Sequence, residues 1–495
     1  MDTRGIPPLS QSTLTAHPDL SILNTNMVIR HGARTPYKPY NCWSSYLTSP
    51  ENSKYDCSTT MLMAPFGTDH HVLFNKKYDA LEEPLTNLLG GSCHVGQLIE
   101  EGAAQEATNG GHIRSAYITT EQSSLKLFRS LPSPPIQFTD LPYARAVRAR
   151  GDDQQRTLMS GQILITGIFD FDNVAEAIID YHTADYDADP IYPNSKICPK
   201  LSKLRDDAIK SGDFVNRNTS SAVRSLTEIL TGPELGYAPW DHILDCQYTT
   251  ICNDRPLPDV LNDFTSEEDR ESVFNKMIDH STWELGYVYT YNDAVFSKLA
   301  MAPLFQEILD QLQTASRFES QEAYTASNTN SVINLFSGHD TTIMPVLAAL
   351  KIWDGVWAPY ASLIVIETFA SEGKHFFRIV YNGKVLTANF EGCSEELCEL
   401  SQLINYLSEF ATSDRDCAHS DAFEDNHYVD VKNGILSGGS FSDAVWVFIV
   451  ILCSSLASYM TWRFSPDRNN EKYGKLREYS KDVLKDLSIA SDDEL

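Results

Sequence analysis

The sequence predicts an α/β protein: a sheet core flanked by helices, with an inserted, mainly helical domain, followed by a C-terminal transmembrane helix. Short apolar runs at 21–29 and 332–336 each end in a polar turn that leads toward a helix. This order of strand, loop and helix is typical of an α/β core. Residues 171–330 instead alternate polar helical segments with turns. Residues 444–462 carry no charge.

Composition limits the class of partner. Of the 495 residues, 42% are hydrophobic, which is ample for a large core. The chain has 39 basic and 67 acidic residues, giving a net charge of −28. That balance argues against nucleic acid as a partner, because phosphate backbones need basic surfaces. Any anion site must therefore be a local basic island.

The first core segment is expected at 21–170, after a leader at 1–20 that we expect to be disordered. The strand at 21–29 opens it, and an irregular loop at 37–95 follows. Loops of that length are usually functional or stapled by disulfides, so we expect this one to wrap the site. Helical patterns then run to about residue 117 and again from residue 155, with a strand at 141–150 between them.

The second core segment is expected at 331–410. It contains the strand at 332–336, a helix over 343–350, and strands at 361–369 and 376–382. Asn382-Gly383 is a strong signal for a tight hairpin turn after the last of these. The mainly helical insertion between the core segments would cover the site and select substrates.

The motif at 30–36, Arg-His-Gly-Ala-Arg-Thr-Pro, follows the first strand directly. Guanidinium groups bind phosphate oxygens in bidentate geometry and stay charged. The charges of Arg30 and Arg34 would also lower the pKa of His31, keeping its imidazole neutral and nucleophilic in mild acid. We expect Gly32 to let a ligand approach the backbone closely. On its own, such a motif is also compatible with a solvated surface turn.

A second polar turn supplies what this motif lacks. His339 and Asp340 follow the strand at 332–336, at the start of a helix. Ligands of open α/β sheets bind at the carboxyl ends of strands, so His31, a basic turn at Arg148 and Arg150, and His339–Asp340 should meet there. Asp340 would be a general acid for the leaving alkoxide, and protonated His339 would bind phosphate.

Ten cysteines indicate disulfides more than reduced thiols or zinc, since no CxxC pair is present. Cys246 and Cys252, and also Cys393 and Cys398, are spaced for local disulfide loops. Nine cysteines lie outside the apolar C-terminal segment, so at least one of them stays free or pairs between chains. Asn218 begins an N-glycosylation sequon.

Residues 444–462 are 19 residues long, enough to span a bilayer. The linker at 411–443 is acidic, and the tail at 463–495 begins with Arg463. The positive-inside rule puts the tail in the cytoplasm and the catalytic body on the lumenal or extracellular side, as in the lysosomal and secretory pathway. Residues 1–26 contain no signal peptide. We favour a start downstream of the natural one; the alternative is a tail anchor with a cytosolic body.

The motif at 30–36, taken with His339-Asp340, resembles the histidine acid phosphatases, the acid-phosphatase and phytase branch of the histidine phosphatase superfamily. Residues 156–160, 359–367 and 378–383 also resemble family segments, and the likeness covers about 22–398. It implies a histidine-phosphatase-like sheet with a helical insertion and no metal or other cofactor. Membrane-bound members of the family carry a C-terminal span.

The resemblance also implies roles for individual residues. His31 would form a phosphohistidine and Asp340 would donate the proton, while Arg30, Arg34 and His339 would hold the phosphate of a small monoester. Spacing back from residue 156 selects Arg150 as the third phosphate-binding arginine, although the family usually has Arg-Ser-Thr where this chain has Arg-Gly-Asp at 150–152. Arg148 is its rival.

Several alternatives stay open at this point. The 37–95 loop and residues 252–256 look closer to the 2-phosphoxylose phosphatase branch than to lysosomal acid phosphatase. A catalytically weak cell-surface binding ectodomain, or a phosphatase specialised for sugar or inositol phosphates, are the competing functions. The sequence does not decide whether the chain forms a homodimer.

Overall fold

The computed structural model describes most of the chain before residue 412. The described residues are 5–37, 42–43, 46, 54–55, 57, 60–62, 74–76, 90–127, 147–169, 179–231, 240–264, 266–327, 330–411 and 417. The predicted transmembrane helix at 444–462, the tail and nearly all of the linker lie outside these ranges. Within them, no helix combines the length and the apolarity needed to cross a bilayer.

A mixed sheet forms the centre of the fold, in the order β11-β10-β9-β1-β8-β6-β7, with β12 on β10. Strands β1, β8, β6 and β7 run parallel, and β9 is antiparallel to β1. The strand bounds are β1 Ser21–Arg30, β6 Val147–Gly151, β7 Tyr181–His182, β8 Ile333–Gly338, β9 Leu363–Ser371, β10 Lys374–Tyr381, β11 Lys384–Val385 and β12 Cys398–Glu399. Short pairs join β2 Lys54–Tyr55 to β5 Gly90–Gly91 and β3 Thr60–Leu62 to β4 Phe74–Lys76.

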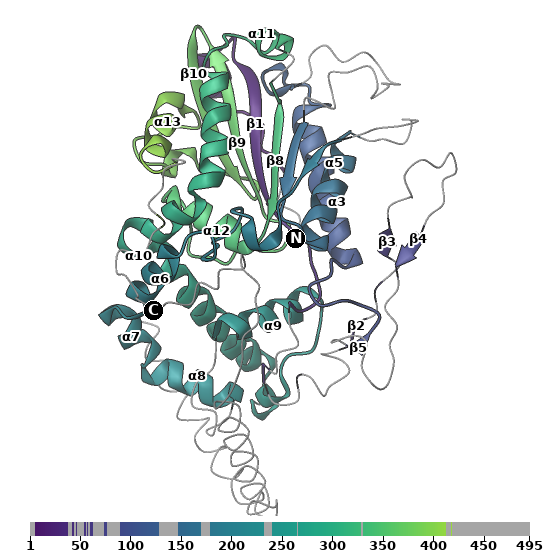
Figure 1. The fold of residues 1–495 in the computed structure, drawn as a ribbon, viewed down its shortest axis with the longest axis vertical. Coiled ribbons are helices and arrows are strands. Elements are labelled where there is room, and N and C mark those ends of the chain that lie inside the picture. Colours follow the sequence, from purple (N-terminus) through teal and green to yellow (C-terminus); the bar gives the residue numbers. More distant parts are fainter. Residues whose placement is uncertain are drawn as a thin grey trace, which may run out of the picture. The chain divides into compact units, whose positions relative to one another are not determined.

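Helices cover both faces of the sheet (Figure 1). Helices α3 Glu100–Tyr117 and α5 Gln155–Phe169 pack on one face; α10 Glu267–Ala315, α12 Asp340–Ala349 and α13 Leu400–Ser408 pack on the other. Alternate residues of β1 serve the two cores: Met27 and Ile29 face α3 and α5, whereas Val28 faces α10 and α12. Burial on both faces explains why the central strands are nearly continuous apolar runs.

The remaining helices lie at the edge where the parallel strands end, below the sheet in Figure 1. They are α6 Lys200–Ile209, α7 Gly212–Asn218, α8 Ser221–Thr231 and α9 Trp240–Cys252, with α11 Gln321–Ala326 elsewhere. Short 3₁₀ turns are η1 Ser123–Leu125, η4 Tyr186–Ala188, η5 Asp259–Asp263 and η6 Thr387–Asn389. The described part of 171–330 is thus mainly helical, apart from β7. Helix α10 kinks at 291–294 and then packs against α12 of the core.

The predicted strands and the hairpin after β10 are present among the described residues, whereas residues 141–146 of the strand predicted at 141–150 lie outside them. Tyr381 pairs with Lys384 across a two-residue turn, and Asn382 and Gly383 both have positive φ, as a type I′ turn requires. The leader differs from our expectation of disorder. Helix α1 Gln11–Ala16 is capped by Ser10, and Leu9 packs against the sheet core.

Disulfides form, but one predicted pair is wrong. Cys393 pairs with Cys398 as expected, whereas Cys246 pairs with Cys42 instead of with Cys252. The other bonds are Cys57–Cys93 and Cys198–Cys417. Cys42 lies 204 positions from Cys246, so local spacing could not predict this bond.

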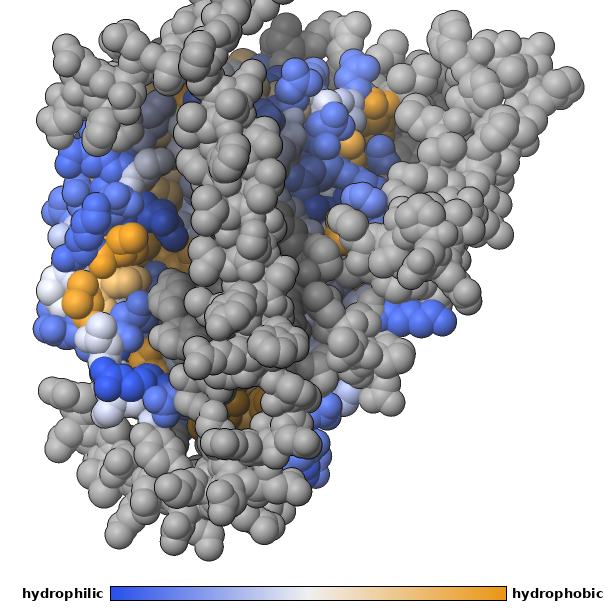
Figure 2. All heavy atoms as spheres, turned by 60° about the horizontal axis from the view of Figure 1, so that its bottom comes forward, coloured by the Kyte–Doolittle hydropathy of each residue, from blue (hydrophilic) through white to orange (hydrophobic). Residues whose placement is uncertain are grey.

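The described surface in Figure 2 is mainly hydrophilic with small apolar patches, in keeping with the charged composition. The Asn218 side chain is half-buried. Its amide donates to Glu284, and its oxygen lies 3.1 Å from Nε2 of His280. Glycosylation would attach a sugar to the same amide nitrogen that donates to Glu284.

Candidate active site

Strand register brings distant polar residues together at one edge of the sheet. Arg30, the last residue of β1, pairs with Gly338 of β8. Gly151, the last residue of β6, pairs with Ser337 of the same strand. The residues that follow these three strands are His31, His339 and Asp152. All of them are buried, so the predicted meeting of the first and second polar turns is present in the structure.

His31 is held rigidly. Its backbone N–H donates to the Gly338 carbonyl, and its own carbonyl accepts from Ala361 N–H. Its Nδ1 lies 2.8 Å from the Gly32 carbonyl oxygen, which makes Nδ1 the protonated nitrogen and leaves Nε2 with a free lone pair. Burial lowers the pKa of His31 well below its ordinary value, and the charges of Arg156 and Arg34 lower it further. The imidazole is therefore neutral in mild acid.

Gly32 has a packing role that differs from the one we expected. A Cβ on Gly32 would lie 2.2 Å from the Gly102 carbonyl oxygen, and a Cβ on Gly102 would lie 2.2 Å from the Ala33 carbonyl oxygen. The two glycines let the first turn of α3 press on the loop after His31. Gly32 thus fixes the loop from behind rather than leaving room for a ligand.

Arg30 and Asp340 form an ion pair next to His31. Arg30 Nη2 lies 2.7 Å from Asp340 Oδ2, and the guanidinium carbon lies 4.1 Å from the centre of the Tyr360 ring. Burial alone would raise the pKa of Asp340, but Arg30 and Arg34 hold it below its ordinary value. The carboxyl group of the ligand-free protein is therefore ionised in mild acid.

Arg34 pairs with a carboxylate from the helical insertion. Its Nη2 lies 2.8 Å from Asp245 Oδ1 of α9. Although burial favours the neutral form, Asp245 raises the pKa of Arg34. Asp245 Oδ2 also accepts the backbone N–H of Tyr37 at 2.7 Å.

The third cation at His31 is Arg156, in the first turn of α5. It is 8% exposed, and burial together with the charge of Arg34 lowers its pKa to about 10. Arg150 lies elsewhere. Its guanidinium pairs with Asp189 at 2.9 Å and with Glu307 of α10, and Arg148 also binds Glu307. Arg156, rather than Arg150 or Arg148, thus occupies the place that our interpretation of the motif gave to Arg150.

His339 is oriented by a carboxylate that the sequence did not single out. Its Nε2 lies 3.0 Å from Oδ2 of Asp152, whose side chain is fully buried. Burial would raise the pKa of Asp152, but its contact with His339 lowers it. The ring of His339 stands edge-on to His31, with 5.4 Å between ring centres.

The three guanidinium groups keep unused hydrogen-bonding capacity. The Nε atoms of Arg30, Arg34 and Arg156 are buried and have no partner among the described residues. Buried donors are normally satisfied, so this cluster fits an oxyanion that brings several acceptor oxygens.

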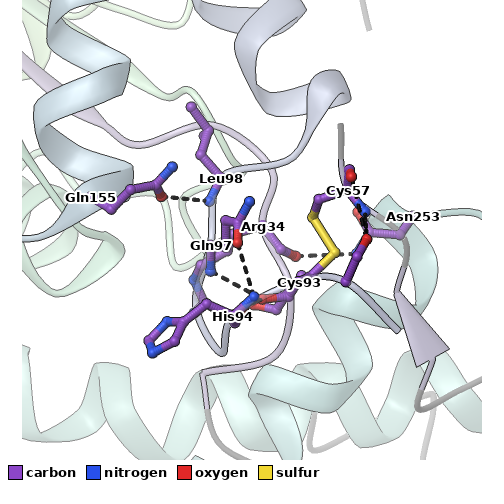
Figure 3. The surroundings of a disulfide bond; sticks show 10 residues. Arg34, Cys57, Cys93, His94, Gln97, Leu98, Gln155 and Asn253 are labelled. Atoms are coloured by element: carbon purple, nitrogen blue, oxygen red, sulfur yellow. Dashed lines mark hydrogen bonds between the residues drawn. A yellow bond between two sulfur atoms is a disulfide. The ribbon is translucent and has the colours of Figure 1, made fainter. Parts of the chain in front are cut away.

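The segment at 92–98, which pairs with Arg34 through Leu98, is held by several bonds (Figure 3). The Cys57–Cys93 disulfide anchors it, and Leu98 N–H donates to Gln155 of α5 at 3.0 Å. On the other side, the Asn253 amide donates to the Arg34 carbonyl at 3.2 Å. These bonds fix the backbone around Arg34.

Comparison with known proteins agrees with this geometry. Residues 22–382 match the model of the histidine phosphatase superfamily, branch 2. The chain belongs to this family. It is accordingly a histidine acid phosphatase, a hydrolase of phosphate monoesters.

Relatives of this histidine acid phosphatase carry varied names. It is 25% identical to counting factor 60 of Dictyostelium discoideum, over 77% of this chain and 84% of that protein. It is 25% identical to human lysophosphatidic acid phosphatase type 6, over 80% and 85% of the two chains. The structure of Hafnia alvei phytase with myo-inositol hexakis sulphate has a TM-score of 0.51 at 15% identity, covering 80% of this chain and 98% of that one, a likeness of fold.

Sequence reasoning thus missed three residues of this phosphatase site: Arg156, Asp152 and Asp245. A signal existed for Arg156, because it opens the helix after β6 and the first turn of such a helix points back to the strand ends. Asp152 directly follows β6 and had the same signal. Asp245 comes from the insertion, and nothing in its local sequence marks it.

Proposed function

We propose that this phosphatase works through a phosphohistidine on His31, with Asp340 as proton donor. The neutral Nε2 of His31 attacks phosphorus, and the bond from phosphorus to the ester oxygen breaks. The leaving oxygen takes its proton from Asp340. Water then attacks the phosphohistidine, gives a proton to Asp340 and releases inorganic phosphate and free His31. The observation that carries the proposal is a neutral, buried imidazole among three buried guanidinium groups.

The cations stabilise charge that develops on the phosphoryl oxygens. Arg30, Arg34 and Arg156 are fixed before substrate arrives, so little reorganisation is needed during the reaction. His339, when protonated, adds a fourth donor. Removing one such donor from a preorganised site typically costs about 10²- to 10³-fold in rate.

Asp340 needs a proton that the ligand-free protein does not give it in mild acid. Its lowered pKa comes from Arg30 and Arg34 acting against burial. A bound phosphate dianion would neutralise the same two arginines and add negative charge beside the carboxyl group. Both effects raise the pKa of Asp340 in the complex, so substrate binding itself favours protonation of the Asp340 carboxyl group.

For the substrate, we propose a small phosphate monoester. One relative is named for lysophosphatidic acid, and the solved structures with a similar fold include a phytase. The presence of both His31 and Asp340 favours turnover over a binding ectodomain, which needs neither. A panel of aryl, sugar, glycerol-based and inositol phosphates would rank the candidates.

The test compares two histidine variants at mildly acidic pH with phenyl phosphate. We expect His31→Ala to lose turnover, because no other side chain supplies the nucleophile. His182→Ala, an exposed residue on β7, should keep it and controls for handling and folding. Full activity in His31→Ala would refute the mechanism.

We also propose that 444–462 anchors the catalytic body to a membrane, with the body lumenal or extracellular. Its support is the uncharged length and the acidic-to-basic change across it. Fractionation of the full chain against a version ending at residue 419 would test this. Recovery of both in the soluble fraction would exclude an anchor.

A further inference from the structure

We propose that Asp245 of α9 is a specificity-determining residue that makes the leaving-group side of the site reject substrates with a second anionic group. The inference rests on the proposed phosphatase function and adds the chemical class of the substrate. That class is a phosphate monoester whose alcohol or phenol carries no negative charge.

Asp245 is fixed at the site. Both carboxylate oxygens are engaged, one by Arg34 at 2.8 Å and the other by Tyr37 N–H at 2.7 Å. The next residue, Cys246, is disulfide-bonded to Cys42. The C-terminal end of α9 is also held, because the side-chain amide of Asn253, directly after the helix, donates to the Arg34 carbonyl. Asp245 therefore cannot swing away when substrate enters.

Asp245 lies on the side where the leaving group departs. Asp340, the proton donor, pairs with Arg30, and Asp245 pairs with Arg34. Both guanidinium carbons lie near the ring of Tyr360, at 4.1 Å and 5.8 Å from its centre, so the two ion pairs are neighbours. Tyr248 is one helical turn after Asp245, on the same face of α9. Tyr248 stacks on Trp357, and the carbonyl of the next residue, Ala358, accepts a hydrogen bond from Arg30, the partner of Asp340. This face of α9 therefore lies beside the Arg30–Asp340 pair.

The rest of that wall is aromatic. Tyr248 stacks on Trp357 with 5.6 Å between ring centres. The Tyr360 hydroxyl and Trp357 Nε1 are buried with no partner among the described residues, so each has a hydrogen bond to offer. Flat, uncharged groups suit such a wall, and a carboxylate or second phosphate would lie close to Asp245.

Charge counting singles out Asp245 among the carboxylates at the site. Asp340 becomes protonated to serve as acid, and Asp152 is committed to His339. Asp245 has neither task, and its partner Arg34 is shared with the phosphate group once substrate is bound. Two like charges about 6 to 8 Å apart, at an effective dielectric constant of about 20, correspond to roughly a 30- to 100-fold penalty. Screening by salt reduces this to about tenfold.

The experiment uses the full chain and a matched substrate pair, phenyl phosphate and 4-(carboxymethyl)phenyl phosphate. The methylene group insulates the phenol from the carboxylate, so the pair differs in charge rather than in leaving-group acidity. At about pH 6 the added carboxylate is ionised. Wild-type kcat/KM should be about tenfold or more higher for phenyl phosphate, and the gap should shrink with added salt.

In Asp245→Asn the gap should fall to about threefold or less. Asparagine still accepts the Tyr37 N–H, and the Cys42–Cys246 bond still holds the helix. Asp254→Asn, an exposed change just after the same helix at a positive-φ position that asparagine tolerates, should keep the wild-type gap.

Equal kcat/KM for the two substrates in wild type would overturn the proposal without any variant. An undiminished gap in folded Asp245→Asn would overturn it as well. If Asp245→Asn does not fold, the difference in wild-type kcat/KM between the two substrates, and its decrease with added salt, test the proposal. Failure of wild type to hydrolyse phenyl phosphate at all would instead refute the proposed function, so the two failures are distinguishable.

Discussion

Replacing Arg156 by alanine should abolish most activity while leaving the fold intact. Replacing Arg150 by alanine should keep most activity but lower the stability of the fold. Arg156 belongs to the cation cluster around His31, whereas Arg150 joins β6 to Asp189 and to Glu307 of α10. The pair of variants therefore separates a phosphate-binding arginine from a structural one.

The structure sets the size of both effects. Arg156 is one of three buried guanidinium groups, and loss of one preorganised donor costs about 3 to 4 kcal/mol of transition-state stabilisation, or roughly 10²- to 10³-fold in kcat/KM. Its pKa of about 10 reflects burial and repulsion by Arg34, so its removal should not lower the melting temperature. Loss of Arg150 leaves the buried Asp189 carboxylate without its cation, which costs about 2 to 3 kcal/mol of stability.

The assay is kcat/KM on phenyl phosphate, with the urea midpoint measured on the same preparations. We expect Arg150→Ala to keep kcat/KM within about threefold of wild type, with a lower urea midpoint. The reasoning would be refuted if Arg150→Ala lost activity by orders of magnitude and Arg156→Ala did not.

Three further predictions concern protons and buried charge. Asp340→Asn should slow alkyl phosphates far more than aryl phosphates, because only poor leaving groups need the proton; equal loss on both would contradict a donor role. Glu367→Gln should lower the unfolding free energy by about 3 kcal/mol in urea titrations, because buried Arg378 loses the more deeply buried of its two charged partners and keeps only Glu396; an unchanged midpoint would contradict this. Burial lowers the pKa of His280 to about 4, so the unfolded chain binds a proton there between about pH 6.5 and 4 and the native state does not. Stability is therefore lost as pH falls through that window, and His280→Gln should flatten the decline of the melting temperature; parallel curves would argue otherwise.

The sequence predicted the centre of the fold well because its signals were local. The strands at β1 and β8 are apolar runs that end in polar turns, and parallel pairing makes such turns meet. His31, His339 and Asp340 follow from this rule alone. Arg30 and Arg34 lie within the first turn or beside it.

The misplaced arginine has a physical reason. Val147 and Ala149 face α3 and α5, so alternation along β6 puts Arg148 and Arg150 on the opposite face, toward Glu307 of α10. Spacing in the sequence could not show which face each residue takes. Helix α5 follows β6, and its first turn lies at the site, which places Arg156 there.

Contacts from the insertion were beyond sequence reasoning for another reason. Asp245 and the Cys42–Cys246 bond depend on how α9 packs against the loop after His31. Such packing is set by tertiary contacts between segments about 200 residues apart, as the 204-residue separation of the two cysteines shows.

The most direct measurement of the central claim is to trap the covalent intermediate. Wild-type protein would be mixed with phenyl phosphate, quenched within the first turnovers under alkaline conditions that preserve phosphohistidine, and digested for peptide mass spectrometry. The account predicts one added phosphoryl group on His31, absent from His31→Ala. A phosphoryl group on another residue, or active enzyme that never carries one on His31, would contradict it.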